Sequence, residues 1–309
     1  MKKYNLSKKL INSFIKAFSL PIPLILEHFD YYIEILDPYY DTKKKLSFFY
    51  KLIDEAQLHN SNIEEWFFNS SNNIYKSIIN DISSKPKYIQ FTNMALKEFE
   101  VKSLTTSSSL YNNAHVGKFF CSIDLKKANY QALNLISNEL VLNTKSYREI
   151  IEKYTHENCV DFFANSKSIR QQIFGNLQPK KQQKIQKYIL NQVVELLIDL
   201  NVSQCHIISC SSDEICFELL DYDITSIKDV ISKKFPFEFH IETFKLCLVK
   251  EDTTLYYKED TIDGKITFKA IPSHNILECI KYIEKKEIDY RDKLFLFEGR
   301  VSSFKDDLL

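Results

Sequence analysis

The sequence predicts an α+β protein, in which an N-terminal helical region precedes a central part that contains a β-sheet. Apolar residues recur every three or four positions through most of residues 1–86 and again through 146–200, which is typical of amphipathic helices. Shorter apolar runs bounded by polar turns, which are typical of strands, lie near 118–124, 205–220 and 237–249. The order strand, helices, hairpin, helix, strand is typical of α+β folds.

The first 86 residues are predicted to be helical. Leu10, Phe14 and Phe18 recur at helical spacing, and Pro21 ends their run. Further helices are predicted at about 24–36, 43–58 and 62–82. The polar stretch 83–86 ends on a proline, so it marks the joint between this region and the rest of the chain.

The remaining residues predict a central region, 87–272, and a C-terminal helix with a tail, 273–309. Beyond the first hairpin, the pattern predicts a helix at about 224–234, a strand at 237–249 and a second hairpin at 254–271. Asp263 and Gly264 together indicate a two-residue turn in that second hairpin. Ser273 is predicted to cap a last helix at about 274–287.

Composition limits the functional classes only weakly. The 309 residues include 41 Lys and Arg and 41 Asp and Glu, so the zero net charge neither indicates nor excludes a nucleic-acid partner. The seven cysteines have mostly apolar neighbours and no zinc-ligand spacing, which predicts reduced core thiols in a reducing, cytoplasmic compartment. No run of about 18 apolar residues and no signal-peptide pattern is present, so no membrane partner is predicted.

Two adjacent acids, Asp213 and Glu214, lie in the polar turn of the hairpin at 205–220. Carboxylates at the tip of a buried hairpin are costly unless a partner compensates their charge, and a divalent cation is such a partner. A third acid, Asp124, ends the strand-like run 118–124 and precedes a helical pattern. The simpler alternatives are a helix-cap role for Asp124 and a solvated turn for the other two acids.

A predicted helix between these acids carries basic and aromatic residues at helical spacing. Lys167, Arg170 and Phe174 follow one another at intervals of three and four residues, so they share one helical face. The two cations could bind the phosphates of a nucleoside triphosphate, and the aromatic ring could stack on a base. Gly175 has no side chain and would let a template base pass close to the helix. The alternatives are a solvated charged face for the cations and a core position for Phe174.

These segments resemble motifs A, B and C of template-directed nucleic-acid polymerases, nearest to the family A DNA polymerases and the phage-type single-subunit RNA polymerases. The resemblance covers about residues 115–220. It implies a polymerase-like palm sheet, helical fingers at about 146–200 and catalytic roles for Asp124, Asp213 and Glu214. It also implies that Asp124 and Asp213 bind two Mg²⁺ ions, with Mn²⁺ as an alternative.

The same resemblance implies that Lys167, Arg170, Phe174, Gly175 and Asn129 bind substrate. A nucleoside triphosphate and a nucleic-acid primer and template are then the expected partners, together with replication or virion proteins of a virus or mobile element. The chain departs from the family pattern in several ways: Asn129 replaces a Glu, Arg170 replaces a Lys, and Ser212 replaces a His. The Tyr-Gly that follows the Phe-Gly pair in the family is absent, and only 43 residues separate Arg170 from Asp213.

Two alternatives to a polymerase remain open at this stage. One is an enzyme like the tRNA 3′–5′ guanylyltransferases, whose Ser-Asp-Glu strand resembles residues 212–214. The other is a degenerate palm that serves as a non-catalytic structural or accessory subunit of a replication or virion complex. A basic stretch formed by Lys180, Lys181, Lys184 and Lys187 is compatible with either a solvated face or a contact with nucleic-acid backbone.

Overall fold

Two groups of helices and a six-stranded antiparallel sheet make up most of the protein. The computed structural model describes residues 6–23, 25–59, 62–101, 109–297 and 300–303. The N-terminal helices are α1 (Lys8–Phe18), α2 (Phe29–Tyr40), α3 (Thr42–Leu58), α4 (Ile63–Ser83) and α5 (Pro86–Asn93). The later helices are α6 (Ala128–Ile136), α7 (Tyr147–Glu152), α8 (Glu157–Asn165), α9 (Lys167–Gly175), α10 (Pro179–Asp199), α11 (Ile224–Lys234) and α12 (Ile276–Ile283).

The N-terminal helices share an aromatic core with the helices of 146–200. Phe14 of α1 packs on Phe49 of α3 with ring centroids 5.3 Å apart. Phe162 of α8 contacts Phe49 at 5.6 Å and Phe67 of α4 at 5.9 Å. Most of the described residues up to 86 are therefore helical, and their apolar faces pack against α8.

The main sheet has the strand order β2-β3-β1-β4-β5-β6, and all neighbouring strands are antiparallel. Its strands are β1 (Phe119–Leu125), β2 (Ile207–Cys210), β3 (Glu214–Glu218), β4 (Phe239–Leu248), β5 (Tyr256–Asp260) and β6 (Ile266–Thr267). The strands β7 (Leu294–Phe297) and β8 (Arg300–Ser303) form a separate pair. The first four strands and their helices follow the β-α-β-β-α-β connectivity of split βαβ units, which makes β1 and β3 neighbours at the centre of the sheet.

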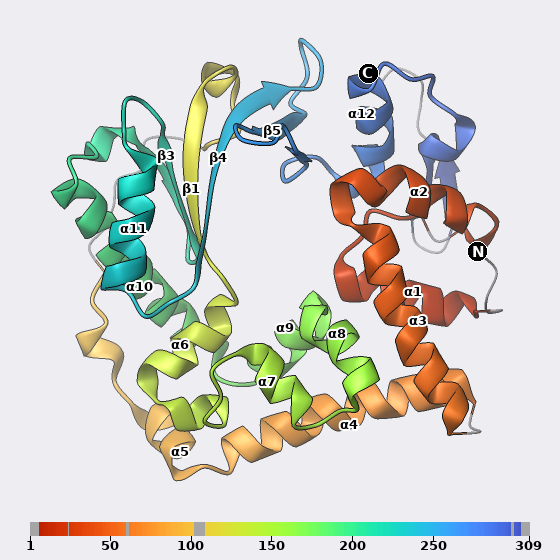
Figure 1. Ribbon diagram of the computed structural model, residues 1–309, viewed down its shortest axis with the longest axis horizontal. Helices are drawn as coiled ribbons and strands as arrows, with labels where there is room; N and C mark the ends of the chain where they lie inside the picture. Colours follow the sequence, from red (N-terminus) through yellow and green to blue (C-terminus); the bar gives the residue numbers. More distant parts are fainter. Residues whose placement is uncertain (1–5, 24, 60–61, 102–108, 298–299, 304–309) are drawn as a thin grey trace.

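Alternation along β1 divides the sheet into two faces. Cys121, Ile123 and Leu125 belong to the large core that includes α10. Phe120 instead joins a smaller apolar cluster on the opposite face, together with Phe244 of β4. Because side chains alternate along a strand, Ser122 and Asp124 lie on this second face. The helices α10 and α11 flank the sheet in Figure 1.

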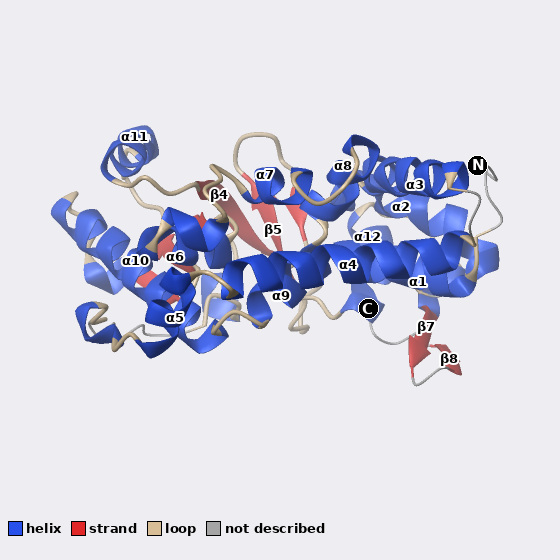
Figure 2. Cartoon of the chain, turned by 90° about the horizontal axis from the view of Figure 1, so that it is seen from below, coloured by secondary structure: helices blue, strands red, loops and turns tan. Residues whose placement is uncertain are grey.

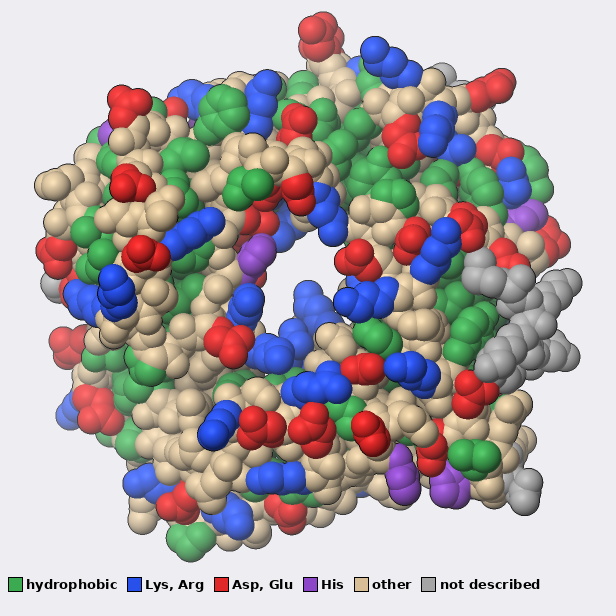
Figure 3. Space-filling model, viewed as in Figure 1, with side chains coloured by type: hydrophobic (Ala, Val, Ile, Leu, Met, Phe, Trp, Pro, Cys, Tyr) green, Lys and Arg blue, Asp and Glu red, His purple; other side chains and the backbone are tan. Residues whose placement is uncertain are grey.

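The elements are arranged around a central opening. Figure 1 shows α4 running from the N-terminal helices toward α5 and α6, and Figure 2 shows it along the length of the molecule. On the other side, Tyr39 of α2 contacts Phe268 with ring centroids 5.3 Å apart, and Lys265 Nζ lies 3.8 Å from Asp41 Oδ2. In Figure 3 the opening passes through the molecule and is surrounded by charged side chains of both signs.

The C-terminal segment packs on α2. Tyr39 donates a hydrogen bond to Glu284 at 2.8 Å, Tyr32 donates to the Arg291 carbonyl at 2.9 Å, and Tyr31 donates to Asp292 at 2.5 Å. These hydrogen bonds join α2 to residues 284–292, which follow about 250 positions later in the sequence.

Three local predictions need correction. Ser273 does not cap α12: it is the first residue of a 3₁₀ turn, and α12 itself spans only Ile276–Ile283. The second hairpin closes through residues 261–265 rather than through two residues, with Gly264 at a φ of 70°. Cys205 is exposed rather than in the core, although all seven cysteines are unpaired. None of the described helices is long and apolar enough to cross a membrane.

Candidate functional site

The pairing of β1 with β3 brings the predicted acids together. Asp124 lies directly opposite Glu214 in the antiparallel register, so their side chains leave the same face of the sheet. The Leu125 amide donates a hydrogen bond to the Asp213 carbonyl at 2.8 Å, which extends the pairing into the turn. Asp124, Asp213 and Glu214 thus meet at one end of the sheet, although Asp124 precedes the other two by about 90 residues in the chain.

Ser211 organises the turn that carries Asp213. Its amide donates to the Glu214 carbonyl at 2.8 Å, and its hydroxyl accepts from the Glu214 amide at 2.9 Å. The same hydroxyl donates to Asp213 Oδ1 at 3.1 Å. These bonds close a tight turn and orient the exposed Asp213 carboxylate.

Asp124 is a half-buried carboxylate at the end of β1. Among the described residues, no side-chain hydrogen bond or salt bridge to it is found within bonding distance. Burial raises the pKa of Asp124, and the neighbouring carboxylates of Glu214 and Asp213 raise it further, against the opposing effect of Lys269 and His240. A cation bound beside Asp124 would relieve this repulsion.

Glu214, by contrast, is held by three neighbours. Its Oε1 accepts a hydrogen bond from Ser122 at 2.6 Å and lies 3.4 Å from both Lys258 Nζ and Lys269 Nζ. Lys258 also pairs with Glu242 at 3.0 Å. Lys258 is only 2% exposed, and its ammonium lies 4.0 Å from the centroid of the Phe244 ring.

These contacts keep Glu214 and Glu242 ionised. Burial acts to raise the pKa of each carboxyl, but the positive charges of Lys258 and Lys269 outweigh burial at both. The Ser122 hydroxyl adds to this effect at Glu214. Both pKa values are therefore lowered. Four carboxylates, those of Asp124, Asp213, Glu214 and Glu242, therefore share this end of the sheet with two lysines. The three predicted acids do not have ligand atoms all within 4.8 Å of one another.

Two further half-buried cations belong to neighbouring segments: Arg170 lies in α9, and Lys127 immediately precedes α6. Arg170 of α9 is half-buried; burial lowers the pKa of its guanidinium, and Tyr147 and Asp124 oppose that effect. Lys127, which precedes α6 at a φ of 50°, is also half-buried. Burial lowers the pKa of Lys127, Glu238 opposes this, and Arg170 adds to it. The charge of Asp124 therefore acts on the pKa of Arg170, and the charge of Arg170 acts on the pKa of Lys127.

The other predicted substrate residues differ in their accessibility. Lys167 is exposed at the first position of α9. Gly175 is exposed at the last position, where an added Cβ would meet nothing within 4 Å. The fold itself therefore does not require glycine at this position.

The predicted stacking role of Phe174 needs correction. Its side chain is fully buried, and its ring packs against Tyr147 with centroids 5.9 Å apart. It therefore offers no face to a base in this conformation. Asn129 is also engaged, because it donates to Gln182 Oε1 at 2.8 Å and Gln182 in turn donates to the Phe174 carbonyl at 2.9 Å.

The basic stretch of α10 has a partly structural role. Lys181 Nζ donates to the carbonyls of Phe91, Thr92 and Met94 at 2.6–2.9 Å, so it caps the C-terminal end of α5. Lys184 donates to the Leu96 carbonyl at 2.6 Å. Two of the four lysines are therefore used to fix the segment that follows α5.

Sequence reasoning missed Ser122, Lys127, Glu242 and Lys258. The alternation of β1 signals Ser122, because it lies two residues before Asp124 and therefore on the same face. No comparable signal exists for Lys258, whose position depends on the pairing of β4 with β5.

No protein-family model, curated protein or solved structure matches this chain significantly.

Replacement of Phe174 by alanine is expected to lower the free energy of unfolding by about 3–5 kcal/mol, because it removes a buried ring from the core. Urea denaturation followed by circular dichroism measures this loss. Phe119→Ala, at an exposed position, serves as the control and should cost much less. A Phe174→Ala protein with unchanged stability and weakened nucleotide binding would show instead that the ring reaches the substrate.

Replacement of Lys258 by alanine is expected to cost about 3–5 kcal/mol, because it leaves Glu214 and Glu242 without their shared buried cation. The carboxyl pKa values are lowered in the folded state, so the contribution of Lys258 is complete above the ordinary Glu value of about 4.5 and declines on acidification. Denaturant titrations at pH 7 and pH 3.5 measure both effects. Lys118→Ala removes an exposed lysine that pairs with the half-buried Glu218 and should change stability by about 1 kcal/mol or less. An equal loss in both variants would contradict a special role for Lys258.

Proposed function

We propose that the protein is a nucleotidyltransferase, and specifically a small template-directed nucleic-acid polymerase. The observation that carries this proposal is the meeting of two separate segments at one end of the sheet. The end of β1 supplies Asp124, and the turn between β2 and β3 supplies Asp213. The helix α9 adds Arg170, whose guanidinium pKa is affected by the charge of Asp124. The order and placement of these residues support the resemblance to motifs A, B and C.

The residues at this site fit a divalent metal. Asp124 is a half-buried carboxylate next to two other acids and lacks a direct cationic partner among the described side chains. Asp213 is exposed in the adjacent turn, and carboxylate oxygens are the ligands that Mg²⁺ prefers. When bound, Mg²⁺ would neutralise the phosphate charge and favour attack by a hydroxyl.

In this proposal, Asp124 and Asp213 hold the metal, and Arg170 binds the triphosphate through its planar guanidinium. Lys127 adds positive charge beside Arg170. Glu214 supports the site, because Ser122, Lys258 and Lys269 fix its carboxylate. The central opening in Figure 3 gives a nucleic-acid strand a route past the sheet.

A non-catalytic subunit with the same fold is the alternative, and one observation favours it. Lys258 and Lys269 lie among the carboxylates and compensate part of their charge. Such a protein would bind nucleic acid or replication proteins without transferring nucleotides, so an activity assay separates the two proposals.

Asp124→Asn and Asp213→Asn are each expected to reduce Mg²⁺-dependent nucleotide incorporation by about a thousandfold or more, since a metal contributes several kcal/mol to such reactions. A primer-extension assay measures the loss. Glu218→Gln, on the same strand as Glu214, is the matched control and should remain active.

Because the folded-state pKa of Asp124 is raised, its ionised form opposes folding above that pKa, so Asp124→Asn should be at least as thermally stable as the parent in EDTA at pH 7. A fully active Asp124→Asn protein would exclude the metal-binding role.

Arg170→Ala is expected to weaken nucleoside triphosphate binding by roughly 10- to 150-fold, because a hydrogen bond to a charged group contributes about 1.5–3 kcal/mol. Nucleotide titrations of single-turnover extension measure this change, and fluorescence anisotropy measures primer–template binding in parallel. Arg148→Ala, which removes an exposed arginine paired with Asp161, is the control. Loss of primer–template affinity with normal nucleotide dependence would assign Arg170 to the nucleic-acid strand instead.

A further inference from the structure

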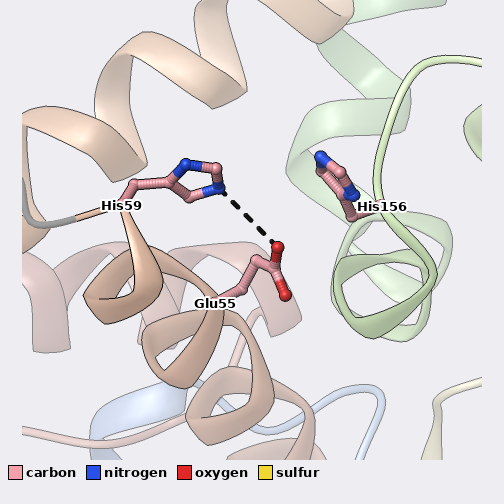
Figure 4. A group of neighbouring side chains, drawn as sticks. All are labelled: Glu55, His59 and His156. Atoms are coloured by element: carbon pink, nitrogen blue, oxygen red, sulfur yellow. Dashed lines mark ion pairs between the residues drawn. The ribbon is translucent and has the colours of Figure 1, made fainter.

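A group of three side chains far from the acids of the sheet has the composition of a transition-metal site. Glu55 lies in the last turn of α3, and His59, four residues later, is the residue that follows that helix. His156 immediately precedes α8. Each residue offers one ligand atom, and these three atoms all lie within 4.8 Å of one another. No other group of three or more such ligands is found among the described residues. Figure 4 shows His59 and Glu55 side by side and His156 across from them.

We propose that Glu55, His59 and His156 bind one divalent transition-metal ion, with Zn²⁺ as the expected occupant, and that this ion ties α3 to α8. Two imidazoles and one carboxylate form a common zinc ligand set, whereas Mg²⁺ and Ca²⁺ prefer oxygen ligands alone. A fourth position remains for water. The proposal concerns a different site from Asp124 and Asp213 and does not depend on their role.

The geometry requires only small side-chain movements. Glu55 Oε1 and His59 Nε2 are 3.7 Å apart. Ligand atoms of a tetrahedral zinc ion stand roughly 3.3 Å apart, given bonds of about 2.0–2.1 Å. Both histidines are exposed, and the ring stacked on His59 is that of Trp66.

Burial of Glu55 gives a physical reason for a cation at this position. Its side chain is 9% exposed, and no Lys or Arg among the described residues forms a salt bridge with it. Asn158 donates a hydrogen bond to Glu55 Oε2 at 3.0 Å, which leaves Oε1 directed toward His59. A buried carboxylate is stable only with a compensating partner, and a bound cation supplies one at neutral pH.

Two neighbours orient the ligands. Trp66 of α4 stacks on the His59 ring, with centroids 5.7 Å apart and an interplanar angle of 19°. Asn158 orients the carboxylate of Glu55 as an outer partner. The C-terminal end of α3 also favours a cation, because the partial negative charge of a helix lies at that end.

The test uses the full chain without a histidine tag. Isothermal titration with Zn²⁺ gives the stoichiometry, which should be one ion at this site. Trp66 is the single tryptophan of the chain, so Co²⁺, a paramagnetic substitute for Zn²⁺, should quench its fluorescence when bound beside His59, and EDTA should restore it. The titrations are repeated in an Asp124→Asn, Asp213→Asn protein, which should retain this Zn²⁺ site.

His59→Ala, His156→Ala and Glu55→Gln should each weaken Zn²⁺ binding by at least about tenfold. Replacement of a residue that only hydrogen-bonds to a metal ligand already lowers metal affinity roughly 10- to 100-fold, so loss of a ligand itself should cost at least as much. Asn158→Ala should have a smaller effect of the same sign. His28→Ala is the matched control, because His28 also pairs with a glutamate, Glu27, at 3.0 Å but belongs to no three-ligand group among the described residues.

Absence of Zn²⁺ binding to the parent protein, or equal binding by the control and His156→Ala proteins, would overturn the proposal. His156 is exposed, so its replacement leaves the core intact and keeps the test decisive if Glu55→Gln fails to fold. A Zn²⁺ signal lost only in the Asp124→Asn, Asp213→Asn protein would assign the ion to the acids of the sheet and would equally overturn it.

Discussion

The antiparallel register between β1 and β3 is the constraint on which the candidate site depends. It places Asp124 opposite Glu214 and joins Leu125 to the first residue of the acidic pair, Asp213. A shift of one residue would turn Asp124 toward the helix-covered core and move Ile123 to the open face. The apolar alternation of β1 therefore fixes the direction of the carboxylate as well as the packing of the sheet.

A second constraint is the charge balance on the open face of the sheet. Lys258 is buried between Glu214 and Glu242 and also contacts the face of Phe244. The protein thus compensates two of its own carboxylates by an internal cation, while Asp124 and Asp213 keep no comparable partner among the described residues. This difference separates acids that maintain the fold from acids that are available to a ligand.

Much of the secondary structure and the identity of the acids could be predicted from local patterns. The helices at residues 8–18, 42–58 and 63–83 and the hairpin at 207–218 follow directly from apolar spacing. The partners of Glu214 could not be predicted, because two strands, β1 and β4, lie between it and Lys258, and no local pattern specifies that strand order. The burial of Phe174 was also hidden, since an apolar residue on a helix has the same spacing whether it faces a core or a substrate.

Asp124 and Asp213 are proposed to bind a divalent metal together. This binding is tested most directly by the anomalous scattering of Mn²⁺ in crystals grown with a non-hydrolysable nucleoside triphosphate. The account predicts an anomalous peak within coordination distance of both carboxylates, with Arg170 on the phosphates. A triphosphate bound elsewhere, with no peak between Asp124 and Asp213, would contradict it.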